Sequence, residues 1–131
     1  MRLTEQEMTA ALTGVAQRVL GAQDKQVRKG KRTPEELWEA TGRYERYVVL
    51  NGLGDQILPV LVALPDVEYA VGARPSFTDE QISEAVESQL GGEGRLKRKV
   101  LLASRVALVK LAIEHLPPRQ DPDAFVVPDH L

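Results

Sequence analysis

Residues 95–116 read RLKRKVLLASRVALVKLAIEHL and predict one long helix. The helix should end before Pro117 and Pro118, because proline cannot continue a helix. A helix that is apolar on all sides is either central in a core or shared across an interface. The sequence therefore favours self-association through this helix, most simply as a homodimer. Its apolar residues cover nearly the whole circumference: Leu96, Val100, Leu101, Leu102, Val106, Leu108, Val109, Leu111 and Ile113.

Three more helix starts share one motif, a threonine followed three residues later by Glu or Gln. In such a capping box the threonine hydroxyl accepts from the later backbone amide, and the later side chain accepts from the threonine amide. We therefore predict helices that begin at residues 5, 34 and 79. The first should end at about residue 20 and the last at about residue 90. The three pairs are Thr4 with Glu7, Thr33 with Glu36, and Thr78 with Gln81.

Gly14 lies inside the first of these helices. Glycine weakens a helix interior by roughly 0.8–1.0 kcal/mol relative to alanine. We expect this cost to be explained by a close approach of another helix.

The helix that starts at Pro34 should extend through Val48, because its apolar face continues that far. Glu39 and Arg43 have the i, i+4 spacing of a stabilising ion pair within one helix.

The next segment is harder to assign. Residues 51–55, Asn-Gly-Leu-Gly-Asp, predict a break or a kink, and a second short helix should follow that Pro59 would bend. Residues 47–50 and 67–71 are rich in residues that favour strands, so one minor β-hairpin is an alternative.

These elements define an all-α fold, a compact bundle of four to five helices. At 131 residues we expect one helical domain over 1–118 and an extended or mobile tail over 119–131. The chain has no cysteine, which excludes disulfides and thiol catalysis. No apolar run approaches the ~18 residues of a membrane span, and no secretory signal is visible. We therefore expect a cytoplasmic protein that does not enter a membrane.

Positive charge is concentrated in two short clusters. They hold nine of the 17 basic residues, which leaves 8 against 19 acidic residues in the remaining chain, a net charge of −11. A glycine-rich turn, Gly91-Gly92-Glu93-Gly94, precedes the second cluster, and free amides at a helix start together with cations can bind an anion or nucleic-acid phosphates. The alternatives are a solvated loop for the first cluster and pairing with acidic residues of the helix at 79 for the second. The clusters are Lys25, Arg28, Lys29, Lys31 and Arg32, and Arg95, Lys97, Arg98 and Lys99.

We find no catalytic set, and we expect no cofactor and no metal. His115 and His130 are the two histidines, and His130 lies among aspartates in a tail that offers no rigid geometry. Aromatic residues near the expected helix break suggest a pocket, although aromatic residues on one helix more often belong to a core. The pocket candidates are Trp38, Tyr44, Tyr47 and Asn51.

The sequence thus predicts a small interaction or regulatory module that binds a protein partner and associates with itself through the helix at 95–116. The alternative is a nucleic-acid- or anion-binding protein that uses the two basic clusters. A small ligand-binding domain or enzyme ranks third.

Overall fold

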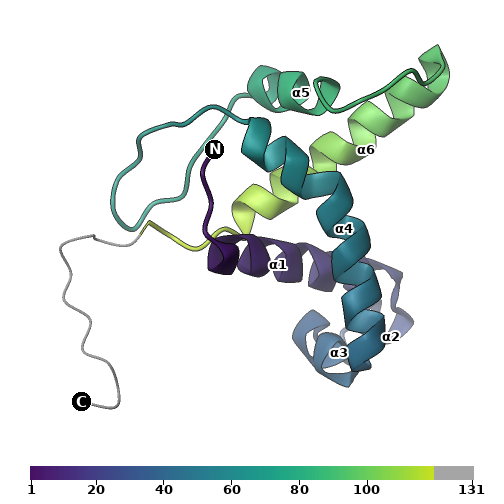
Figure 1. The fold of residues 1–131 in the computed structure, drawn as a ribbon. Coiled ribbons are helices and arrows are strands. Elements are labelled where there is room, and N and C mark those ends of the chain that lie inside the picture. Colours follow the sequence, from purple (N-terminus) through teal and green to yellow (C-terminus); the bar gives the residue numbers. More distant parts are fainter. Residues whose placement is uncertain (120–131) are drawn as a thin grey trace.

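The computed structural model describes residues 1–119, so the tail expected from residue 119 onward lies outside the described residues except for its first one. In Figure 1, α1 lies across the lower part of the molecule, α4 rises from the α2–α3 end toward α5, and α6 runs from the upper right down to α1. The helices of the described part are α1 (Glu5–Gln23), α2 (Lys25–Arg28), α3 (Pro34–Ala40), α4 (Arg43–Ala63), α5 (Asp79–Glu87) and α6 (Arg95–Glu114).

The all-α class is confirmed for residues 1–119, but the helix count is six rather than four to five. The added helix is the short α2, where a loop was expected. Asp24 caps the start of this helix, because its carboxylate accepts from the backbone amide of Val27 at 3.0 Å.

All three capping boxes are confirmed. In the first, the Thr4 hydroxyl accepts from the Glu7 amide at 3.1 Å, and the Thr4 amide donates to the Glu7 carboxylate at 2.9 Å. The boxes that start α3 and α5 repeat this geometry. Each satisfies backbone amides that a helix start otherwise leaves without partners.

The expected helix from Pro34 through Val48 is wrong, because the chain turns a corner between α3 and α4. Arg46 holds this corner: its guanidinium donates to the carbonyl of Thr41 and to that of Glu39, both at 2.9 Å. Glu39 consequently pairs with Arg46, at 3.9 Å, and not with Arg43 as the helical spacing predicted. Carbonyls at the end of α3 are thereby satisfied by a side chain rather than by a continuing helix.

A break at residues 51–55 with a separate short helix after it is also wrong, since α4 continues through both glycines and through Pro59. Burial explains this outcome, because Leu53, Gly54 and Ile57 all lie inside the core. A Cβ atom on Gly54 would lie 3.5 Å from Leu12 Cδ1, an ordinary van der Waals distance, so α4 contacts α1 at this point. Tertiary packing overrides helix propensity here.

The minor hairpin is absent from the described part of the chain. Residues 47–50 are helical, and residues 67–71 form an irregular segment. Arg119 fixes that segment, because its guanidinium donates to the Tyr69 carbonyl at 2.7 Å, and its backbone amide donates to the Ala73 carbonyl at 2.8 Å.

The core lies where α1, α4, α5 and the C-terminal half of α6 meet. At its centre α1 crosses the end of α6, and buried Gly14 faces His115 there. A Cβ atom on Gly14 would overlap the His115 ring and would lie only 2.6 Å from the His115 Cβ. The expected close helix contact is therefore present. The fully buried large side chains are Val15, Ile57, Val60, Leu61, Leu64, Val86, Val109 and Leu116.

We predict that Gly14→Ala lowers the free energy of unfolding by about 1–3 kcal/mol, because the added methyl group overpacks the α1–α6 crossing. The control is Gly52→Ala in α4, where an added Cβ meets nothing within 4 Å. That variant should gain about 0.5–1 kcal/mol. Urea unfolding followed by circular dichroism measures both values, and a gain in both variants would contradict the assigned contact.

Candidate functional site

The two halves of α6 have different surroundings. Val109 and Ala112 in its C-terminal half are fully buried. In its N-terminal half Leu96 is 81% exposed and Val100 is 67% exposed. Full burial is therefore confined to the C-terminal half of α6, while in the N-terminal half Leu102 is partly buried against the core and the opposite side is exposed.

The exposed residues of the N-terminal half form one continuous stripe. Leu96, Val100, Ala103 and Ala107 are all exposed, and their 4-3-4 spacing places them within an arc of about 60° on the helix. Val109 and Ala112 lie on the opposite side of the helix. We call these four residues the α6 stripe.

The start of α6 is shaped by the glycine turn before it. The Glu93 carboxylate folds back and accepts from the Gly91 amide at 3.2 Å, and Arg98 donates to the Gly91 carbonyl at 3.2 Å. Hydrogen bonds from the backbone amides of Glu93 and Gly91, helped by the charges of Arg98 and Arg105, hold the pKa of the Glu93 carboxyl below its usual range. The Glu93 carboxylate of the chain itself therefore accepts hydrogen bonds from backbone amides of the glycine turn.

The remaining cations of the second cluster point to solvent. Arg95, Lys97 and Lys99 are exposed and form no ion pair within residues 1–119. Between α5 and α6, the described part contains one ion pair, from Lys110 to Asp79 at 2.7 Å.

We predict that Glu93→Gln destabilises the fold at neutral pH and that the difference from the native chain shrinks as the pH falls from about 5 toward 2. The reason is that a pKa lowered by folding stabilises the fold above the usual pKa, and this contribution disappears as the pH falls through the lowered value. Urea unfolding across this pH range tests the prediction, with Glu87→Gln as an exposed control. A difference that is constant with pH would contradict it.

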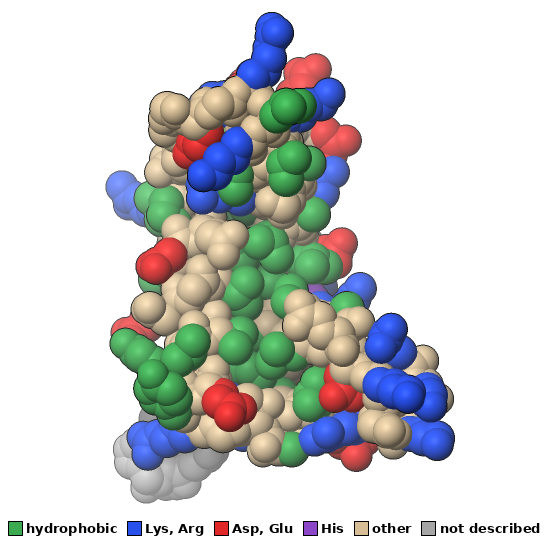
Figure 2. Space-filling view, turned by 90° about the vertical axis from the view of Figure 1, so that its right-hand side faces the viewer, with side chains coloured by type: hydrophobic (Ala, Val, Ile, Leu, Met, Phe, Trp, Pro, Cys, Tyr) green, Lys and Arg blue, Asp and Glu red, His purple; other side chains and the backbone are tan. Residues whose placement is uncertain are grey.

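The first cluster surrounds α2. Lys25 and Arg28 belong to the helix, Lys29 caps its end, and Lys31 and Arg32 follow Gly30, whose φ of 73° makes the turn. Figure 2 shows Lys and Arg side chains at the top and at the lower right of one face, near the start of α6 and near α2, with hydrophobic side chains between them. The two clusters therefore lie at opposite ends of one face.

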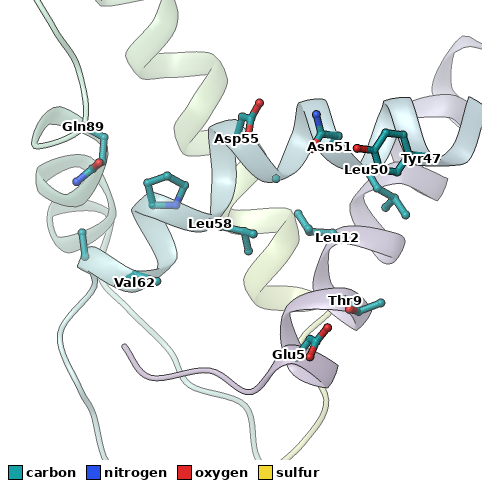
Figure 3. Close-up of a pocket in the computed structure, with 13 residues that line it drawn as sticks. Glu5, Thr9, Leu12, Tyr47, Leu50, Asn51, Asp55, Leu58, Val62 and Gln89 are labelled. Atoms are coloured by element: carbon teal, nitrogen blue, oxygen red, sulfur yellow. The ribbon is translucent and has the colours of Figure 1, made fainter.

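The four pocket candidates separate in the structure. Trp38 is 6% exposed, and its ring lies 5.5 Å below the Arg46 guanidinium, whereas Tyr44 is 77% exposed. Tyr47 and Asn51 line an open groove of about 1190 Å³ between α1 and α4, shown in Figure 3. We call it the α1–α4 groove.

Most of this groove was not predicted from the sequence, because a helix interrupted at residues 51–55 would not form its α4 wall. One feature of the sequence did indicate a continuous helix here. The residues at 47, 51, 58 and 62 recur at helical spacing across both glycines: Tyr47, Asn51, Leu58 and Val62. The groove is lined by Glu5, Thr9, Leu12, Tyr47, Leu50, Asn51, Gly54, Asp55, Leu58, Pro59, Val62, Ala63 and Gln89.

Within residues 1–119 no group of three or more His, Cys, Asp or Glu side chains could hold a metal ion. His115 packs on Gly14, and its Nδ1 lies 2.8 Å from the Leu111 carbonyl, while His130 is outside the described residues. In the same part of the chain, no helix combines the length and the apolar character needed to span a bilayer.

No known protein family, curated protein or solved structure matches this chain.

Proposed function

We propose that this protein is an interaction or regulatory module that associates with itself through the α6 stripe. The observation that carries this proposal is the exposure of Leu96 and Val100 on the side of α6 opposite the core. Burying a Leu or Val side chain completely is worth about 1.5–3 kcal/mol. Contact with a partner would recover this free energy, which the fold of one copy leaves unused.

The spacing of the stripe supports a helical contact. Leu96 and Ala103 correspond to the d positions of a heptad, and Val100 and Ala107 correspond to the a positions. Two heptads with two alanines bury little area, so the association should be reversible and should depend on protein concentration.

We predict that Leu96→Glu and Val100→Glu each abolish self-association without changing the helical content, because both side chains are exposed in one copy. Analytical ultracentrifugation over a wide concentration range measures the association, and circular dichroism checks the fold. The control is Val71→Glu, which places the same charge on an exposed valine of the 64–78 segment.

A native chain that stays monomeric up to about millimolar concentration, where even weak associations are populated, would overturn this proposal. Equal association of the native chain and both α6 variants would overturn it as well.

A second candidate function is binding of nucleic acid or another polyanion. The observation that favours it is the position of the two basic clusters on one face, with Arg95, Lys97 and Lys99 free of ion pairs in the described structure. The order α5, glycine turn, α6 also permits a helix-turn-helix type of contact in which only the first turn of α6 would meet DNA.

For this function we expect fluorescence anisotropy to show binding of a DNA duplex that weakens steeply with salt, because each phosphate contact releases counterions. Replacing Arg95, Lys97 and Lys99 by alanine should weaken binding at least tenfold and reduce the salt slope. Replacing Arg18 and Arg43, exposed cations outside the clusters, should change binding less. Equal losses in the two variants would contradict a specific role for the second cluster.

A further inference from the structure

The α1–α4 groove has an apolar floor and an acidic rim. Leu12, Leu50 and Leu58 form part of the floor, and Val62, 60% exposed, lies on its wall. Glu5 from α1 and Asp55 from α4 lie at the edges (Figure 3). No Lys or Arg lines this groove.

Both rim carboxylates are available to a partner. Glu5 and Asp55 are exposed, and neither forms an ion pair within residues 1–119. An open groove with an apolar floor and unpaired acids at its rim fits an amphipathic helix with basic flanks.

The start of α6 has this composition. Lys97 and Lys99 flank the α6 stripe on its two sides, and Arg95 lies in the same turn. If two α6 stripes packed on each other in parallel, these cations would be brought together, and like charges at an interface oppose association. In an antiparallel pair the cations would lie at opposite ends of the contact, with no acidic residue of either stripe to pair with. The basic flanks therefore favour an acidic surface as the partner of the stripe.

The dimensions agree as well. At 1.5 Å per residue, the stripe from Leu96 to Ala107 extends over about 17 Å, and the groove follows α4 from Tyr47 to Val62 over about 22 Å. No residue of the stripe lines the groove of its own chain. Within residues 1–119, stripe and groove are thus not in contact with each other, and they match in length, in apolar character and in the charge at their edges.

We infer that the α1–α4 groove binds the N-terminal half of α6 from a second copy of this chain. This inference rests on the proposed self-association and names the surface that receives the stripe. When the docking is reciprocal, each copy contributes one stripe and one groove, and the two contacts close a two-fold dimer.

The first experiment separates the two surfaces by mixing variants. One variant, Leu96→Glu with Val100→Glu, keeps the groove but loses the stripe. The other, Val62→Lys, keeps the stripe but places a cation in the groove at an exposed position. We expect each variant alone to associate at least tenfold more weakly than the native chain, and a 1:1 mixture to form a heterodimer through the one intact stripe–groove contact. Native mass spectrometry distinguishes the heterodimer by its mass.

The second experiment exchanges charges across the contact. Asp55→Lys alone, and Lys97→Glu with Lys99→Glu alone, should each weaken association several-fold. Combining all three substitutions in one chain should restore it, because the rim and the flanks again carry opposite charges. Tyr44→Lys is the matched control, since Tyr44 is an exposed residue of α4 that does not line the groove.

The outcomes distinguish this inference from the proposal beneath it. If the native chain does not associate, both are overturned. A different result would be that the α6 variant loses association, that Val62→Lys and Asp55→Lys associate like the native chain, and that the mixture gives no heterodimer. The module would then associate by α6–α6 pairing or on another surface. The groove assignment is then overturned while the proposed self-association stands.

Discussion

The contact between Gly14 and His115 is the constraint on which the arrangement of this protein depends. It joins the middle of α1 to the end of α6 at a distance that only a glycine permits. Because α6 is held there at its C-terminal end, Val109 and Ala112 enter the core while the N-terminal half extends away from it. This crossing, together with the packing of α4 and α5 on α6, leaves the α6 stripe and the basic residues beside it exposed.

Local features of the fold could be predicted from the sequence, and long-range features could not. Thr4, Thr33 and Thr78 cap helices as expected, because a capping box involves residues only three positions apart. The glycines at 52 and 54 were misinterpreted, because their cost in helix propensity is smaller than the gain from burying Leu53 and Ile57 against neighbouring helices. The corner held by Arg46 depends on a side chain that donates to carbonyls of Glu39 and Thr41 across a non-helical turn, and the spacing of residues in the sequence does not indicate such a contact.

In the candidate site, too, the sequence indicated the local features and not the long-range ones. The uniform apolar character of α6 was visible in the sequence, but the sequence could not tell which half the core would take. The α1–α4 groove was missed because it exists only where α1 and an unbroken α4 lie side by side. The concentration of cations at residues 95–99 could be read directly from the sequence. The structure adds that Glu5 and Asp55 carry the opposite charge at the edge of a separate apolar surface.

The division of α6 also has a consequence for motion. Regions with few buried contacts open locally at much lower free energy than the core. In a single copy, α6 near Leu96 and Val100 is exposed apart from the glycine turn that Arg98 contacts, whereas Val109 is fully buried. Amide hydrogens should therefore exchange along α6 with a gradient from fast to slow, and a partner that covers the first half would turn two independently opening segments into one cooperative unit.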